Sequence, residues 1–111
     1  MKNYAYVVLS NPVPGRDQEY NDWYSNRHLA DVVAVPGFVS AQRFRLVDPE
    51  AEDAPHQRYM AIYRMQTDDP SAIVAELQTL VETGQMEMSD AFSQSDMAIH
   101  LYEEITPVVE V

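Results

Sequence analysis

The residues best suited to catalysis lie in one short segment that contains Trp23, Tyr24, His28 and Asp31. Histidine is the side chain whose ordinary pKa lies closest to neutral pH, so His28 is a candidate for proton transfer. On a helix, Tyr24 lies one turn before His28 and Asp31 one turn after it, so both can reach its ring. Tyr24 would donate a hydrogen bond or a proton, and Asp31 would fix the tautomer of the ring. The segment therefore predicts His28 and Tyr24 as catalytic residues, with Asp31 in support.

The same residues allow structural interpretations. A single histidine on an aromatic helix is often a core residue whose ring is hydrogen-bonded to the backbone. Asp31 can pair with Arg27, four residues earlier, instead of with His28. Trp23 suits the protein core and a pocket wall equally well.

Aromatic residues are numerous enough to build a binding pocket. Seven tyrosines, three phenylalanines and one tryptophan suit a flat aromatic or alicyclic ligand, although they can also fill a small core. We expect the substrate-binding residues to be Trp23, Tyr6, Tyr63, Arg43 and His100.

Arg43 shares one face of a predicted strand with Arg45. Either side chain would stabilise an anion that develops on a bound substrate if it faced the pocket. Both can instead balance acidic neighbours, so the pattern leaves open which arginine, if either, faces the pocket.

Absent residue types exclude several classes of chemistry. The chain has no cysteine, which excludes thiolate nucleophiles, disulfides and Cys-ligated metals. Lys2 is the only lysine, and the three glycines are far apart, so neither a Schiff-base lysine nor a Gly-rich phosphate cradle is present. The histidines at 28, 56 and 100 lack metal-ligand spacing. We therefore expect no cofactor and no metal.

The charge of the chain restricts its partners. The formal net charge is -11, and no Lys or Arg follows Arg64. Nucleic acids and anionic membranes both need a basic surface, so we expect neither as a partner. The chain begins with a strand-like pattern and has no apolar run long enough to span a bilayer, so we expect a cytoplasmic protein that binds a small molecule.

The order of predicted elements indicates an α+β fold. Strand-like patterns cover residues 3–10, 38–47, 58–65 and 97–104, and residues 105–111 form a β-prone tail. Helical patterns run from a cap at Asp17, with a second stretch over 28–35, and from Asp69-Pro70 to a stop at Gly84; residues 86–95 fit a loop or a short helix. This order predicts one ferredoxin-like βαββαβ domain over residues 1–111, with an antiparallel four-stranded sheet and both helices on one face.

The first strand is apolar on both of its faces. Ala5, Val7 and Leu9 alternate with Tyr4, Tyr6 and Val8, which is unusual for an antiparallel sheet with one solvated face. Because two helices cover only one face, we expect a second copy of the chain to cover the other, as a homodimer.

Several segments together resemble the dimeric α+β barrel superfamily, in particular its EthD-like and muconolactone-isomerase-like branches. They are Trp23-Tyr24…His28-Leu29, Val35-Pro36-Gly37-Phe38, Arg43-Phe44 and Ala61-Ile62-Tyr63, and the likeness covers nearly the whole chain. The resemblance implies a dimeric barrel in which a histidine and nearby tyrosines act in a pocket between sheet and helices. That role maps onto His28 and Tyr24. The chain lacks the cysteine that methylmuconolactone-type isomerases use.

From the residues and the resemblance we expect a cofactor-independent isomerase, cyclase or carbon–carbon lyase. It would act by proton transfer on an aromatic, polyketide-like or lactone substrate in catabolism or secondary metabolism. The superfamily also implies other functions: a non-catalytic EthD-like binding or stress protein, a cofactor-free monooxygenase, or a haem enzyme. A haem enzyme fits least, because haem propionates need basic partners and this chain has few.

Overall fold

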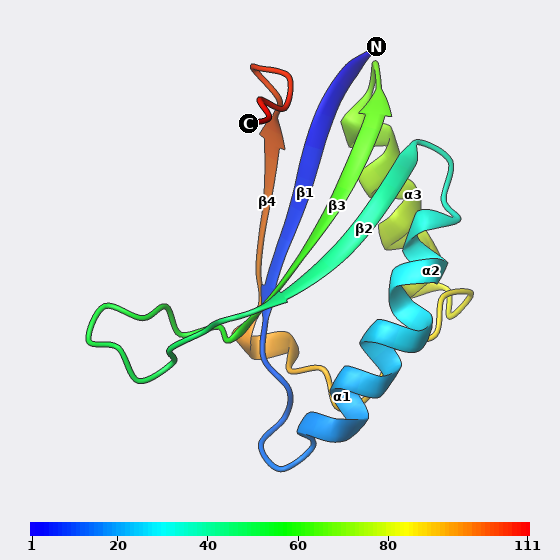
Figure 1. Cartoon of the computed structure of the whole chain (residues 1–111). Helices are drawn as coiled ribbons and strands as arrows, with labels where there is room; N and C mark the ends of the chain where they lie inside the picture. The colour runs from blue at the N-terminus through cyan, green and yellow to red at the C-terminus, as the bar shows by residue number, and fades with distance from the viewer.

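The computed structural model describes residues 1–111 and contains four strands and three α-helices. The strands are β1 (Lys2–Ser10), β2 (Phe38–Arg45), β3 (Tyr59–Thr67) and β4 (Ala98–Glu103). The helices are α1 (Asp17–Trp23), α2 (Leu29–Val33) and α3 (Pro70–Glu82), with a π-helical turn η1 (Tyr24–His28) and a 3-10 turn η2 (Gln94–Asp96). The antiparallel sheet has the order β2-β3-β1-β4, and the helices lie on one side of it (Figure 1). The predicted ferredoxin-like α+β fold is confirmed.

The ends of the helices match the sequence signals in part. The carboxylate of Asp69 accepts a hydrogen bond from the Ala72 amide at 3.2 Å and so caps α3 as predicted. The predicted cap at Asp17 is wrong, because Arg16 holds the cap position and no side chain caps α1. The Asp17 carboxylate instead pairs with the Arg58 guanidinium at 3.2 Å, which joins α1 to the start of β3.

Two other expectations about local structure are corrected. The predicted second helical stretch is not separate, because α1, η1 and α2 follow one another without a break. The tail after residue 104 forms no strand, since it pairs with no other strand and its side chains are exposed.

The core lies between the helices and the face of the sheet that points toward them. Alternate residues of the central strands are buried there, as the period of a strand requires. The largest fully buried side chains are Tyr20, Tyr24, Tyr63 and Met65.

Gly37, in the turn between α2 and β2, is required by both backbone and packing. Its φ is +106°, and an added Cβ would lie 2.1 Å from Cδ1 of Ile73 on α3. We expect Gly37→Ala to lower the free energy of unfolding by about 2–3 kcal/mol, measured by urea denaturation. Gly15 is a matched control, because its φ is +83° but an added Cβ would contact nothing within 4 Å. Equal losses in both variants would contradict the packing argument.

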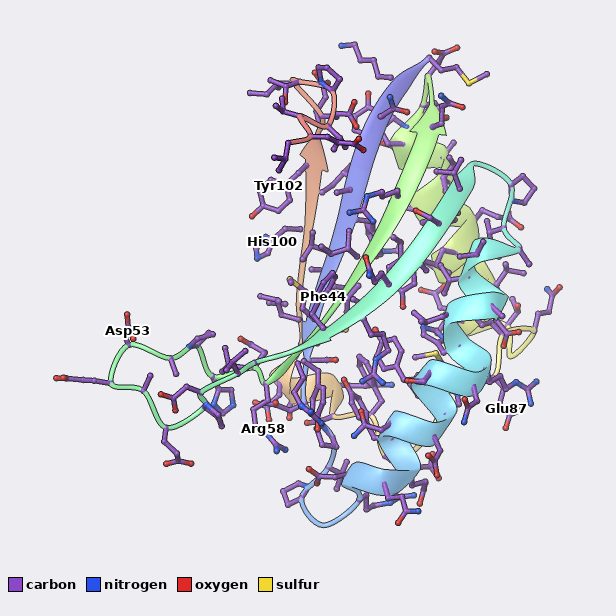
Figure 2. All side chains as sticks on the ribbon, viewed as in Figure 1. Phe44, Asp53, Arg58, Glu87, His100 and Tyr102 are labelled. Carbon is purple, nitrogen blue, oxygen red and sulfur yellow. The ribbon has the colours of Figure 1, made fainter.

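The second face of the sheet carries apolar side chains that the chain does not cover. In the strand register, Val7 lies opposite Ile62 and His100, and Leu9 lies opposite Met60. Residues directly opposite one another in an antiparallel pair share a face, so these side chains form one surface. We call it the open face; it points away from the helices (Figure 2). None of the helices has the length and apolar character needed to cross a membrane.

Candidate functional site

A cavity of about 340 Å³ lies between the sheet and the helices. Strands β1 and β3 contribute Tyr6, Val8 and Tyr63 to its wall, and η1 contributes Tyr24 and His28. The rest of the wall comes mostly from α3 and the segment that follows it, and is largely apolar. The cavity is therefore an apolar space that contains a few hydroxyl groups and one imidazole.

His28 is a buried base in this cavity. The residue is 7% exposed, and its Nδ1 atom is buried without a hydrogen-bond partner. Burial lowers the pKa of His28 from 6.5 to about 4, and the nearby Asp31 carboxylate opposes this shift. At neutral pH the ring is therefore uncharged and able to accept a proton. It is not a core histidine satisfied by the backbone.

Tyr24 and Tyr63 form a hydrogen-bonded pair beside this base. The Tyr63 hydroxyl donates to the Tyr24 hydroxyl at 3.2 Å. Burial raises the pKa of both hydroxyls above the ordinary tyrosine value, so both stay protonated near neutral pH. Because Tyr24 accepts from Tyr63, its own O–H remains able to donate to a ligand. The cavity thus offers a donor on Tyr24 and an acceptor on His28, beside the hydroxyl of Tyr6 and the amides of Gln78 and Gln94.

The π-helical turn determines which rings meet around His28. The Leu29 amide donates to the Tyr24 carbonyl, five residues earlier, instead of four as in an α-helix. In an α-helix, residues five apart point about 140° away from each other around the axis. The wider turn lets Trp23 stack on His28 with ring centres 4.5 Å apart, while Tyr24 meets the same ring edge-on at 5.1 Å.

Trp23 supports the base from behind and does not line the cavity. Its indole N–H donates to the Glu87 carbonyl at 3.3 Å and so ties the segment after α3 to the helix. The sequence interpretation missed the stack, because it relied on α-helical spacing. The only available signal was an aromatic residue five positions before the histidine.

Asp31 does not fix the tautomer of His28. Its carboxylate accepts a hydrogen bond from Nε of Arg27 at 3.4 Å, and the Arg27 guanidinium also pairs with Glu87 at 2.6 Å. The alternative pairing considered from the sequence is therefore the one observed. Asp31 acts on His28 only through its charge, which favours the protonated ring.

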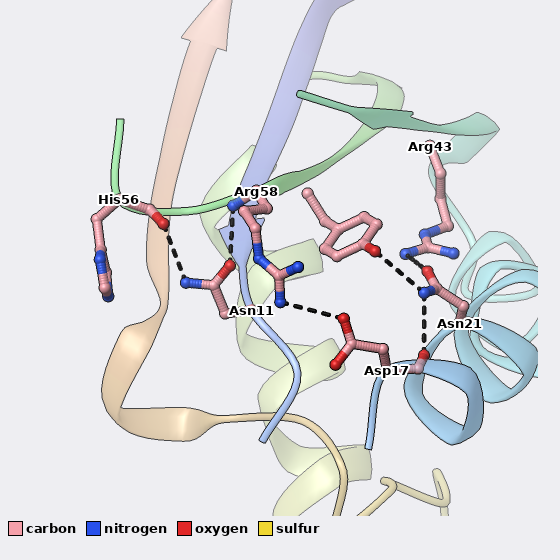
Figure 3. A network of polar contacts seen from close by, with 7 residues as sticks. Asn11, Asp17, Asn21, Arg43, His56 and Arg58 are labelled. Carbon is pink, nitrogen blue, oxygen red and sulfur yellow. Dashed lines mark hydrogen bonds and ion pairs between the residues drawn. The ribbon is translucent and has the colours of Figure 1, made fainter. Parts of the chain in front are cut away.

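Arg43 lies behind Tyr24 and outside the cavity wall. Its guanidinium carbon is 4.5 Å from the centre of the Tyr24 ring. The guanidinium donates to the Asn21 side-chain oxygen at 2.9 Å (Figure 3). It also donates to the Ser25 hydroxyl at 2.7 Å. Arg43 therefore joins β2 to the helix and fixes Tyr24, and its expected contact with substrate stays a prediction. Arg45 is exposed and lines no part of the cavity.

His100 is also outside the cavity. It lies opposite Val7 in the strand register, while the cavity uses the alternate residues Tyr6 and Val8. Figure 2 shows His100 and Tyr102 on the side of the sheet away from the helices. Neighbouring residues of a strand point to opposite faces, so His100 lies on the face opposite to the cavity. Its expected contact with substrate stays a prediction.

The sequence interpretation missed the third wall of the cavity. It consists of Leu77, Gln78, Val81 and Glu82 on α3 and of Phe92, Gln94 and Met97 after it. The apolar face of α3 was recognised, but residues 86–95 had no periodic pattern. Nowhere in the structure do three or more His, Asp or Glu side chains converge as a metal site requires.

The buried neutral state of His28 predicts a stability that depends on pH. The unfolded chain binds a proton at His28 below pH 6.5, but the folded chain does so only below about pH 4. The free energy of unfolding should therefore fall as pH is lowered through this window, by up to about 3 kcal/mol from this residue. Denaturation of the wild type and of His28→Gln between pH 7 and pH 4 measures the effect. Parallel curves for the two proteins would contradict it.

No family model matches the chain. A segment of 51 residues, 45% of this chain, is 41% identical to "Core atranone cluster (CAC) protein 1" of Stachybotrys chlorohalonatus. That segment spans only 20% of the length of the fungal protein.

Solved structures cover nearly the whole chain. A Bordetella bronchiseptica protein described as an antibiotic biosynthesis monooxygenase has a TM-score of 0.65 at 16% identity, over 96% of this chain and 100% of that one. The haem degrader MhuD of Mycobacterium tuberculosis was solved with two haems in its active site. It has a TM-score of 0.65 at 13% identity, over 96% of this chain and 99% of that one. An EthD family protein of Bacillus halodurans has a TM-score of 0.57 at 18% identity, over 95% of this chain and 100% of that one. These identities show the fold alone, and that fold is the predicted ferredoxin-like α+β fold.

Proposed function

We propose that this chain is a cofactor-independent enzyme that moves a proton on an aromatic, polyketide-like or lactone molecule bound in the cavity. The observation that carries the proposal is His28: an uncharged imidazole, 7% exposed, that makes no hydrogen bond within the chain and belongs to the wall of an apolar cavity. A neutral imidazole without a hydrogen bond in the chain is free to exchange a proton with a molecule bound beside it, and such perturbed buried groups are typical of active sites.

The mechanism uses the acceptor on His28 and the donor on Tyr24. His28 takes a proton from an acidic C–H or O–H of the substrate, and the electron pair moves onto a substrate oxygen to form an enolate or phenolate. The Tyr24 O–H donates a hydrogen bond to that oxygen as its charge develops. The imidazolium then returns the proton to another atom of the substrate. A positive ring and a negative substrate form together, so neither is left unpaired in the apolar cavity.

A cofactor-free monooxygenase is the second candidate, and the fold shared with a monooxygenase supports it. The first step would be the same proton transfer to His28. The substrate carbanion would then reduce dioxygen, converting a CH₂ group to a carbonyl with release of water, and the substrate would supply all the electrons.

The haem that MhuD binds does not fit this cavity. None of the lining residues is Lys or Arg, and the one charged lining side chain is the carboxylate of Glu82. The propionates would have no cationic partner and one anionic neighbour. We therefore derive no step through haem.

Turnover under two atmospheres tests the proposal. The purified protein is incubated with hydroxyaromatic compounds, polyketide-like ketones and lactones, in air and under argon, with a chelator present. Products that form equally under argon support an isomerase, cyclase or lyase. Products that need oxygen, with one dioxygen consumed for each, support the monooxygenase. Binding without turnover in both atmospheres would overturn catalysis and leave a ligand-binding protein.

A further inference from the structure

The polar residues that line the cavity fall into two groups. Tyr6, Tyr24, Tyr63 and His28 are buried, whereas Gln78, Glu82 and Gln94 line the same cavity but are exposed to solvent. The exposed group comes from α3 and from η2. The cavity therefore opens to solvent between α3 and η2, and we call these three exposed residues the mouth.

Glu82 gives the mouth a negative charge that no nearby cation balances. The ion pairs in the structure involve other carboxylates. Residues 65–111, which supply α3, η2 and β4, contain neither Lys nor Arg. The cavity wall contains no cation either. A ligand must pass an unpaired carboxylate and then enter a space with no positive group.

We propose that Glu82 is a specificity-determining residue that makes the cavity select uncharged ligands and reject carboxylates. The inference rests on the proposed function, in that it takes the cavity as the substrate site. Two effects add. A carboxylate loses its hydration in the apolar wall without gaining a partner, and Glu82 repels it.

Hydrogen bonding inside the cavity narrows the ligand class further. The buried groups without an acceptor or donor partner in the chain are the His28 imidazole, the O–H of Tyr24 and the hydroxyl of Tyr6. A phenol or enol can donate its O–H to the imidazole and accept a hydrogen bond from a tyrosine hydroxyl. A carboxylate has no proton for a neutral imidazole. The preferred substrates are therefore uncharged phenols or enols.

A matched pair of probes tests the selection by isothermal titration calorimetry. 2-Naphthol and 6-hydroxy-2-naphthoate share the ring and the hydroxyl and differ in one carboxylate. We expect the naphthoate to bind the wild type at least 100-fold more weakly. Glu82→Gln should reduce the ratio of the two dissociation constants, naphthoate over naphthol, by roughly 3- to 10-fold, as expected for one exposed charge near the ligand. Glu82→Lys should narrow it more, and high salt should reduce the effect of both substitutions.

Glu76→Gln is the control, because Glu76 is exposed on α3, carries the same charge and lies outside this cavity. Equal changes of the affinity ratio in Glu82→Gln and Glu76→Gln would show that the net charge of the protein, and not the position of Glu82, sets the selection. That result would overturn the role of Glu82. Equal affinity of the wild type for both probes, or no binding of either, would overturn the selection itself. Retained turnover in a His28 variant would refute the proposed catalysis but not the selection, which is measured by binding alone.

Discussion

His28→Gln is expected to lower kcat by roughly two to four orders of magnitude while the protein stays folded. Glutamine keeps a polar side chain of similar reach but cannot take up a proton. His28→Ala should lose the same activity, because the ring acts mainly in the transition state. Turnover and thermal melting of the same samples, after a substrate has been found by the screen in air and argon, measure both quantities.

His56→Gln is the matched control for this prediction. His56 is exposed, its ring pairs with Asp96 at 2.9 Å, and it is not among the residues that line the cavity. Its substitution should leave kcat unchanged. If His28→Gln keeps its turnover per folded molecule, His28 is only a core residue. The alanine variant would then lose about 1–3 kcal/mol of stability, and its activity would fall only in proportion to the folded fraction.

The second large effect concerns the open face of the sheet. We expect the chain to form a homodimer through this face, and Ile62→Asp to weaken that dimer by at least roughly 10³-fold. Ile62 lies opposite Val7 at the centre of the apolar surface, so the substitution would bury an unpaired carboxylate in each half of the interface. Light scattering at micromolar concentration should find a dimer for the wild type and a monomer for the variant.

Gln18→Glu adds the same charge at an exposed position on α1 and should leave the dimer intact. Tyr6 and Tyr63 are unsuitable for this test, because both side chains are buried on the helix side of the sheet. A charge at either position would disrupt the core and the cavity. A stable wild-type monomer would refute the dimer prediction.

Local patterns in the sequence were enough to predict most of the architecture. Alternation and β-branched residues identified the four strands, and Asp69-Pro70 and Gly84 marked the two ends of α3, because each signal acts within a few residues of the backbone. The order of elements then restricted the topology to one common arrangement. Asp17 was not the cap, because the helix begins at Asp17 itself and its carboxylate pairs with the distant Arg58.

The sequence alone also identified His28, Tyr24, Tyr6 and Tyr63 as candidate site residues, and the structure brings all four to one cavity. It did so because residue type and strand or helix periodicity restrict where a side chain points. The catalytic role assigned to them stays a prediction.

Only the tertiary structure decided which other residues join them. Arg43 and His100 were candidates by type, but the register of β2 and β4 places one behind Tyr24 and the other on the open face. The π-helical turn put Trp23, instead of Asp31, against the imidazole. The mouth with Glu82 came from α3 and a segment without periodicity. Side-chain type and spacing are local properties, whereas strand register, an added residue in a helical turn and the closing of a cavity depend on contacts between distant parts of the chain.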